Sequence, residues 1–420
     1  MKKEIFAAVC ACFLASGSVC AQEGQSKLGA EEAQSPLDYD LVSQQVSGDG
    51  MPMTGNAVQL YGLLTPTIAY TKSTGARSPG VNGPSAVRFA SNGSFWGIRG
   101  TEDLGGGWQA IFQYENTINL GTGTNTNASG TFAGRDTFVG VQSDKFGVVE
   151  MGYLTSPLYN TVGIYKFLGD QLPIASTTTL MTTLNGTSLQ FNQRVAGAVL
   201  YSTSKDSEGL VGHFLYSNNQ SDPSDDTPAG RVYTLSGSYG AGPLYLQYVY
   251  ESRLDQNKLA ASGNDWDHRI VGRYSFTPTF AVAFGLDYAG SDGTYGKKAA
   301  MGDGRVSRQA ATISLAKNLG RHELIASYGI ARGLKCSGAA ANVSASCLAA
   351  NQSSTGAQQA SLVYEYQFSK RTSVATYVSR IWNRSQGLYD FDSTPVVQSV
   401  SARSPGADPL GFGVGILTTF

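Results

Sequence analysis

Arg135-Asp-Thr-Phe-Val-Gly-Val-Gln142 and Phe146-Gly-Val-Val-Glu-Met-Gly-Tyr153 are two strand-like runs separated by the tight turn Ser143-Asp-Lys145. Residues 154–192 then show no repeating pattern, and alternation resumes at Gln193-Arg-Val-Ala-Gly-Ala-Val-Leu-Tyr201. An insert of nearly forty residues without secondary structure is uncommon in a compact domain and is usually functional. The stretch therefore indicates a sheet protein whose strands are built around one long functional loop.

The same alternation of large apolar with small or polar side chains recurs along most of the chain. It is clear in residues 58–65, 280–289 and 360–368. Half-exposed strands have this pattern in a soluble sandwich as much as in a membrane barrel. Beyond residue 21 no run of about 20 apolar residues occurs, so the sequence predicts no transmembrane helix. If the chain spans a membrane, it must do so as a closed barrel, because only closure satisfies the strand edges in lipid.

The lengths of the links separate the two architectures. We predict sixteen strands, over residues 58–72, 87–101, 107–119, 134–143, 146–154, 193–204, 209–218, 230–240, 243–253, 266–276, 279–290, 306–317, 320–332, 357–368, 371–384 and 409–420. Their links alternate between short turns, such as 144–145, and long loops, such as 155–192. Transmembrane barrels have this alternation, with the short turns at the periplasmic rim. The predicted fold is therefore all-β: a 16-stranded antiparallel transmembrane β-barrel with an inward-folded third loop.

The first residues have the features of a secretory signal peptide. Residues 1–21 begin with two lysines and an apolar core, and Val19-Cys-Ala21 is a small-residue cleavage site before Gln22. Cys20 leaves a lipoprotein signal as an alternative.

An acidic stretch follows the signal peptide. Residues 22–56 carry six acidic residues against the single base Lys27, with few branched or aromatic side chains. This composition predicts a disordered N-terminal extension, and a periplasmic contact or partial plug is the alternative. Residues 57–420 are then the barrel.

Composition argues against several classes of function. Of the 420 residues 15% are charged, the net charge is -1 and there is no basic stripe, so nucleic-acid binding is not expected. Three histidines leave little room for metal or acid–base chemistry, and we predict no metal and no cofactor. Asp267 and His268 could be half of a catalytic dyad, but the chain has no Gly-x-Ser-x-Gly elbow. We therefore predict that the protein is not an enzyme.

Two cysteines remain beyond the signal peptide. Cys336 and Cys347 lie in one long predicted loop, and in an oxidising compartment they could close it. A disulfide there would stabilise the loop by about 2–3 kcal/mol. Free thiols are the alternative.

Four segments carry a family resemblance. They are Val58-Gln-Leu-Tyr-Gly62, Trp96 to Gln113, Phe138-Val-Gly-Val141 with Phe146-Gly-Val148, and Gly411 to Phe420. In order, they resemble the first strand, the second hairpin, the hairpin before the constriction loop and the closing strand of the Gram-negative general (trimeric) porin family. The resemblance implies a homotrimer, and it implies that the outer-membrane insertion machinery reads the terminal Phe420.

In that family, acids on the constriction loop face arginines on the wall. Arg135 and Arg194 match two of those arginines and open the strands on either side of the loop. The alternation puts Arg135 on the face of Thr137 and Val139. It puts Arg194 on the face of Ala196 and Ala198, with Val195, Val199 and Tyr201 on the opposite, apolar face. A charge facing lipid at mid-depth would cost roughly 2–4 kcal/mol, so both arginines are predicted to point into the lumen.

The loop and wall also depart from the family pattern. Asp170 matches the acidic segment, but Ile174 stands where a second acid is expected, and Phe95 and Tyr153 stand where further wall arginines are usual. The predicted pore constriction has six residues: Arg135, Arg194, Asp170, Tyr153, Phe95 and Ile174. Three more arginines could add positive lining or form salt bridges at a rim: Arg99, Arg273 and Arg308.

These observations predict an outer-membrane channel for passive diffusion of small hydrophilic solutes and ions. A barrel of this size holds a water-filled passage unless something narrows it, and charges at the constriction then set a modest selectivity. The expected surroundings are outer-membrane lipid, two further copies of the chain and the insertion machinery. An adhesin or receptor scaffold acting through the surface loops is the alternative, and a barrel-borne hydrolase is a third hypothesis.

Overall fold

The computed structural model describes residues 57–77, 82–91, 93–121, 133–167, 172–188, 191, 193–204, 209–218, 230–254, 264–292, 304–338, 347, 352–391 and 404–420. The predicted signal peptide and the acidic extension lie outside these residues, so both stay predictions.

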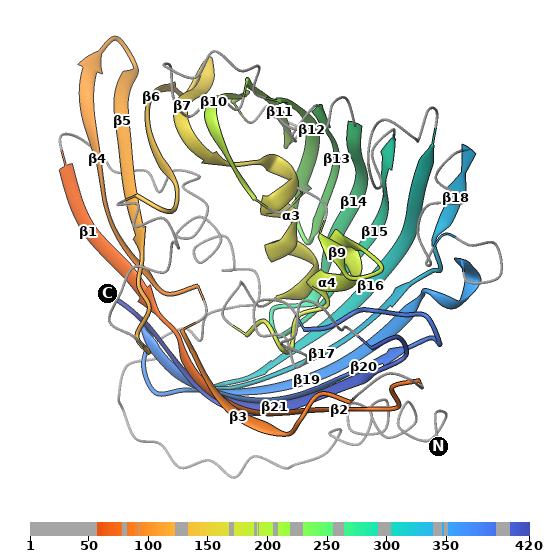
Figure 1. Ribbon diagram of the computed structural model, residues 1–420. Coiled ribbons are helices and arrows are strands. Elements are labelled where there is room, and N and C mark those ends of the chain that lie inside the picture. Colours follow the sequence, from red (N-terminus) through yellow and green to blue (C-terminus); the bar gives the residue numbers. More distant parts are fainter. Residues whose placement is uncertain are drawn as a thin grey trace. The chain divides into compact units, whose positions relative to one another are not determined.

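Within the described residues the strands form one closed antiparallel barrel of 16 strands (Figure 1). In chain order the wall consists of β1 (Ala57–Leu64) with β2 (Pro66–Thr74), β3 (Ala86–Ser91) with β4 (Phe95–Gly105), β5 (Trp108–Thr117), β6 (Thr137–Ser143), β7 (Gly147–Thr155), β10 (Arg194–Ser202), β11 (Leu210–Ser217), β12 (Arg231–Ala241), β13 (Leu244–Leu254), β14 (Asn264–Thr277), β15 (Phe280–Asp292), β16 (Arg305–Leu319), β17 (His322–Ala331), β19 (Ala357–Gln367), β20 (Thr372–Asn383) and β21 (Asp408–Thr419). The predicted fold class is confirmed.

The first two wall strands are each interrupted once, at the same height. Thr65 separates β1 from β2, and its backbone N–H donates to Ser94 Oγ at 2.9 Å, in the break between β3 and β4. The barrel closes where β21 pairs with β1 and β2. There Phe420 and Gly62 exchange two backbone hydrogen bonds of 3.1 and 3.2 Å. The last residue of the chain is thus part of the closing seam.

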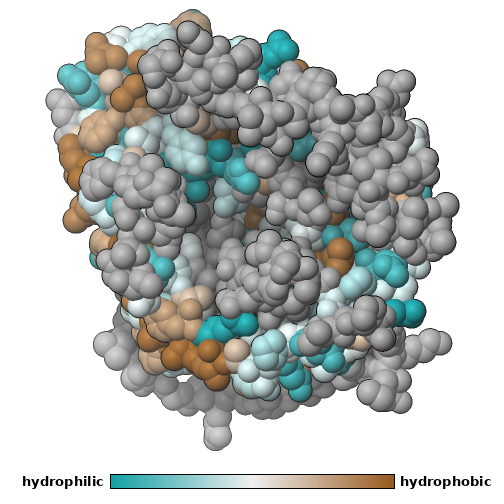
Figure 2. Space-filling model, in the orientation of Figure 1, coloured by the Kyte–Doolittle hydropathy of each residue, from teal (hydrophilic) through white to brown (hydrophobic). Residues whose placement is uncertain are grey.

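The strands turn an apolar face outward and a small or polar face inward. In β15, Leu286 and Tyr288 are exposed on the outside, whereas Ala283 and Asp287 are buried on the inside. Figure 2 shows hydrophobic side chains along the left and lower-left outer edge of the wall and hydrophilic ones nearer the middle. An apolar outer surface combined with a polar interior suits a barrel in lipid. This arrangement is the reverse of a soluble sandwich.

The two rims of the barrel differ in the length of their links. Residues 106–107, 242–243 and 278–279 are examples of the short turns at one rim, and residues 156–193 and 384–407 of the long loops at the other. The predicted alternation of links is confirmed. In outer-membrane barrels the short turns face the periplasm and the long loops face outward.

The insert between β7 and β10 is not structureless, and this corrects the sequence prediction. It contains α3 (Pro157–Lys166), α4 (Thr178–Thr182) and a small hairpin of β8 (Thr183–Leu184) and β9 (Thr187–Ser188). Figure 1 shows both helices inside the ring of strands. None of the described helices is long and apolar enough to cross a membrane.

The main core of the protein lies between this insert and the inner face of β14 to β20, which we call the anchoring wall. Small side chains cover that wall: Ala281, Ala283, Ala310, Ala316, Ala331, Ala357 and Ala375 are all buried. Apolar side chains of the insert pack against them, among them Val162, Tyr165, Leu172, Leu180 and Met181. Small wall residues therefore make room for a second layer of chain inside the barrel.

The seventh long loop carries further structure that the sequence did not predict. It contains β18 (Lys335–Ser337), which pairs with β16 beyond the end of β17, and the short 3-10 helix η4 (Gln352–Ser354). Cys336 and Cys347 are joined by a disulfide in this loop.

Candidate pore constriction

The insert begins with a capped helix. Ser156 Oγ accepts a hydrogen bond of 3.2 Å from the backbone N–H of Tyr159, and Pro157 occupies the first turn. Serine at the N-cap followed by proline is a favourable helix start. The helix ends at Phe167, whose φ of 54° is left-handed. These local signals define where α3 begins and ends, but its position depends on the wall.

Two fully buried arginines of the wall hold the insert by its backbone. Arg269 on β14 donates to Leu158 O at 3.4 Å, to Thr161 Oγ1 at 3.1 Å and to Met181 O at 3.1 Å. Arg308 on β16 donates to Met181 O at 3.0 Å and also to the carbonyl of Leu180. The carbonyls at the end of a helix lack intrahelical partners, and here the two guanidinium groups satisfy them.

The same arginines are neutralised by two carboxylates. Arg269 pairs with Asp267 at 2.9 Å and with Asp287 at 2.9 Å, and Arg308 pairs with Asp287 at 2.6 Å. All four side chains are fully or nearly fully buried. A buried charge is tolerated when it is paired and hydrogen-bonded, and this cluster meets both conditions.

A third contact fixes the returning part of the insert. Gln359 on β19 donates to Ile174 O at 3.3 Å and to Ser176 O at 2.9 Å. Ile174 is 2% exposed and packs among the buried apolar residues of the anchoring wall. Ile174, at the position where a second acid was expected, therefore contributes apolar packing and no charge.

Arg135 forms an ion pair on the opposite side of the barrel. Its Nε lies 3.1 Å from Glu115 Oε2, and its guanidinium lies 4.4 Å from the centre of the Phe95 ring. Glu115 Oε1 also accepts hydrogen bonds from Tyr61 at 2.8 Å and from Gln113 at 3.1 Å. The predicted residues Arg135 and Phe95 are thus in contact, and the aromatic face favours the cation that it meets.

Arg194 forms the neighbouring ion pair. Its Nε lies 2.5 Å from Asp136 Oδ2, and Asp136 also accepts from the backbone N–H of Thr155 at 2.6 Å and from its hydroxyl at 2.8 Å. The guanidinium of Arg194 lies 5.7 Å from the ring centre of Tyr159 on α3. This arginine therefore bridges the barrel wall and the insert.

Four charges thus meet where β5, β6, β7 and β10 approach the insert. We call Glu115, Arg135, Asp136 and Arg194 the charge quartet, and the inner face of β1 to β7 and β10 the quartet wall. Arg135 and Asp136 are consecutive in the chain, so the two ion pairs are adjacent. The quartet carries two positive and two negative side chains, and its charges compensate each other.

Asp170 lies outside the described residues. Tyr153 pairs with Thr137 and follows Met151 by two positions, and Met151 is exposed on the apolar face.

The strand pattern around Arg135 requires a correction. The alternation predicted Val139 on the inner face, but Val139 is 64% exposed and lies opposite the exposed Phe112, whereas Phe138 is buried opposite Gln113. The prediction failed because β6 begins only at Thr137, so Arg135 precedes the strand. The prediction that Val195 faces lipid is also wrong, because Val195 is buried next to a bulge in β10.

Sequence reasoning also misjudged or missed several functional residues. Arg308 was a candidate for the pore lining or for a salt bridge at a rim; it pairs with Asp287, but it is 1% exposed beneath the insert and not at a rim. Arg269 and its partners Asp267 and Asp287 were missed as anchors. A signal was present, because these charges share the small-residue face of their predicted strands, and charged side chains in a membrane strand must face inward.

Comparison with known proteins agrees with this architecture. The family model described as Gram-negative porin matches residues 7–386. An outer membrane porin protein of Bordetella pertussis is 28% identical over 387 residues, covering 83% of this chain and 94% of that protein.

Solved structures share the fold. An anion-selective porin from Comamonas acidovorans superposes with a TM-score of 0.62 at 20% identity, covering 87% of this chain and 100% of that one. The trimer form of OmpT from Vibrio cholerae superposes with a TM-score of 0.60 at 13% identity, covering 87% and 100%. Since the family model spans most of the sequence and the strands close into a barrel, the chain belongs to the Gram-negative porin family and is an outer-membrane diffusion channel, not an enzyme.

Proposed function

We propose that the passage runs along the quartet wall, carries small hydrophilic solutes and ions, and discriminates only modestly by charge. The observation that carries this proposal is the compensation within the charge quartet. Arg135 is matched by Glu115 and Arg194 by Asp136 at hydrogen-bonding distance. Compensated charges produce a weak field in the passage, whereas selectivity needs an excess of one sign.

The anchoring of the insert supports the same route. The insert packs against β12 to β20, so the free part of the lumen lies towards β1 to β7 and β10. We include Arg135, Arg194 and Phe95 in the constriction, with Asp170 as the acid contributed by the loop. Ile174 supports the loop from behind through its packing on the anchoring wall.

The test is the reversal potential in a salt gradient across a planar bilayer. Arg135→Gln and Arg194→Gln each leave a carboxylate of the quartet without its base, so both variants are expected to shift towards cation preference. Arg305→Gln is the matched control, because Arg305 pairs with Asp292 at the long-loop rim at 2.6 Å. If the double variant Arg135→Gln and Arg194→Gln keeps the wild-type reversal potential, the quartet does not belong to the constriction.

We also infer that the chain assembles as a homotrimer through the outer face of β1 to β7. That face carries large exposed apolar side chains, with Val87 72% and Val58 71% exposed, and large exposed apolar patches mark interaction sites. Val58→Lys combined with Val87→Lys should convert trimers to monomers in native mass spectrometry. Leu235→Lys, at an exposed apolar position of β12, is the control. Equal dissociation by both changes would contradict this choice of face.

The closing strand is the proposed contact with the insertion machinery. Phe420 is 46% exposed and its backbone completes the seam with Gly62. Phe420→Ala should lower the amount of protein in the outer membrane while refolding in detergent proceeds as in wild type. Equal amounts in cells would contradict the proposal.

The proposed leader is tested by the mature N-terminus. Mass spectrometry of the purified protein should find Gln22 as the first residue, followed by the acidic stretch to residue 56. An uncleaved chain, or one that begins at a lipid-modified Cys20, would contradict cleavage at this site.

A further inference from the structure

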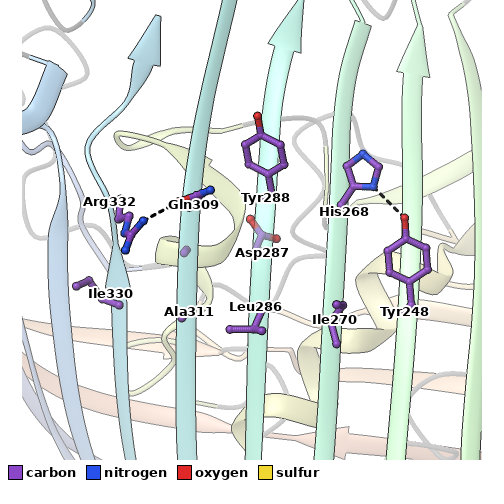
Figure 3. Close-up of a pocket in the computed structure, with 11 residues that line it drawn as sticks. Tyr248, His268, Ile270, Leu286, Asp287, Tyr288, Gln309, Ala311, Ile330 and Arg332 are labelled. Carbon is purple, nitrogen blue, oxygen red and sulfur yellow. Dashed lines mark hydrogen bonds between the residues drawn. The ribbon is translucent and has the colours of Figure 1, made fainter.

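A hollow on the outer wall between β13 and β17 is lined by two rows of side chains. The volume of the hollow is about 480 Å³. The lower row is apolar, since strand pairing aligns Ile270, Leu286, Ala311 and Ile330. Ala311 is the small member of that row, so a gap opens between Leu286 and Ile330. Figure 3 shows this row beneath a second, polar one.

The upper row is polar and carries a cation. His268, Tyr288 and Gln309 are aligned by strand pairing, and Arg332 Nη1 donates to Gln309 Oε1 at 3.0 Å. At the other end of the hollow, Tyr248 and His268 share a hydrogen bond of 2.9 Å. Arg332 is exposed, and among the described residues no carboxylate lies within salt-bridge distance of it. Asp287 also lines the hollow, but its carboxylate pairs with the buried Arg269 and Arg308 on the inner side of the wall. The hollow is therefore apolar on one side and positive on the other.

Aromatic side chains near the two rims indicate where the edges of the lipid are expected. The rings of Tyr288 and Trp266 form a T-shaped pair near the long-loop rim, and the rings of Phe280 and Phe276 are in contact near the short-turn rim. Eight residues of a strand tilted by about 45° span roughly 19 Å. This distance is close to the height of the apolar band in outer-membrane barrels, about 25 Å, which aromatic girdles flank on both sides. The apolar row thus lies at the depth of acyl chains, and the polar row lies at the depth of headgroups on the long-loop side.

We propose that this hollow binds an acylated, phosphorylated lipid of the outer leaflet. One acyl chain fills the gap above Ala311, and the phosphate is held by the Arg332 guanidinium, with Gln309 and Tyr288 beside it. Arginine suits this task, because its planar donors match phosphate oxygens. The inference depends on the long-loop rim facing outward and goes beyond the channel function itself.

The test compares lipids that remain bound in native mass spectrometry of the detergent-extracted protein. Diphosphorylated lipid A and zwitterionic phosphatidylethanolamine, added separately at equal concentration, are the probes. Wild type should retain lipid A in preference to phosphatidylethanolamine. Arg332→Gln should lower lipid A retention about tenfold, the value of one hydrogen bond to a charged group. Ala311→Leu should lower it by filling the gap.

Two matched controls keep the test specific. Arg371→Gln removes an exposed arginine at the short-turn rim, and Ala360→Leu enlarges a side chain on β19 away from the hollow. Both controls should retain lipid A as wild type does. Equal retention of the two lipids by wild type, or wild-type retention by Arg332→Gln, would overturn the site. The site would also be overturned if a second copy of the chain bound to this face, which would appear as a dimer mass that Ala311→Leu abolishes.

Single-channel conductance separates this proposal from the channel assignment. Arg332→Gln and Ala311→Leu lie outside the lumen, so both should conduct as wild type does. A folded, conducting Arg332→Gln variant that keeps its lipid A would overturn the lipid site and leave the channel function intact.

Discussion

The two halves of the inner wall use arginine in different ways. On the anchoring wall, Arg269 and Arg308 are wholly buried, and besides pairing with carboxylates each donates to two backbone carbonyls of the insert. On the quartet wall, Arg135 and Arg194 pair with carboxylates and lie over aromatic rings. The first pair holds a segment of chain in place, whereas for the second pair we propose a role in setting the charge beside the passage. An inward-facing arginine in such a barrel is therefore not necessarily part of the pore lining.

Removing one of the two anchoring arginines should have the largest effect on stability. A small effect would contradict the difference between the two walls. Arg269→Met leaves Asp267 without its ion-pair partner and Asp287 with Arg308 alone, and breaking a buried pair from one side costs about 3–5 kcal/mol. The free energy of unfolding in detergent, from denaturant titration, is the measurement. Arg371→Met at the exposed short-turn rim is the control and should change it by about 0.5 kcal/mol or less. An equally small loss for Arg269→Met would contradict the anchoring role.

Crowding the anchoring wall should have an intermediate effect. A Cβ added to Gly285 would lie 3.0 Å from Met181 Cε and 3.1 Å from Thr312 Cγ2. Gly285→Val should therefore displace α4 and destabilise the protein by about 1–3 kcal/mol, as overpacking does. Gly237→Val is the matched control, because no atom lies within 4 Å of a Cβ added there. If both variants unfold at the same denaturant concentration, the insert does not pack on β15 as described.

Weakening one bond of the charge quartet should have the smallest effect. Thr155→Val removes the 2.8 Å hydrogen bond from the hydroxyl to Asp136 and keeps the backbone bond. We expect a loss of about 1 kcal/mol and a small shift of the reversal potential, since Asp136 is then less tightly held next to Arg194. Thr312→Val, under the insert, should affect stability without moving the reversal potential. A shift of the reversal potential in Thr312→Val but not in Thr155→Val would contradict the division into an anchoring wall and a quartet wall.

The strands were predictable because their signal is local and repeated. Alternation over ten or more residues and the regular change of link length indicated both the barrel and its rims before any contact was known. The helices of the insert were not predictable in the same way. Residues 157–166 include β-branched Thr161 and Val162 and also Gly163, which have weak helix propensity. Packing against the anchoring wall stabilises α3, and a short helix needs such packing.

The candidate site was partly predictable for the same physical reason. Charges on the small-residue face of a membrane strand must point inward, and this rule applies to Arg269 and Arg308. It could not distinguish an anchor from a lining residue, because that depends on where the insert lies. The face of Arg135 was derived from a strand that does not include it, since β6 begins at Thr137. Contact with Glu115 across β5 brings it inward instead.

The central claim is that the insert covers the anchoring wall and leaves the passage along the quartet wall. Single cysteines at Gln142 and at Ala283 test this claim most directly. Both residues lie on inner faces near the short-turn rim. Only Ala283 is fully buried, and it belongs to the cluster of residues packed against the insert. A charged thiol reagent added during single-channel recording should reduce the current through Gln142→Cys and leave Ala283→Cys unchanged. Modification of Ala283→Cys at a comparable rate would contradict the account.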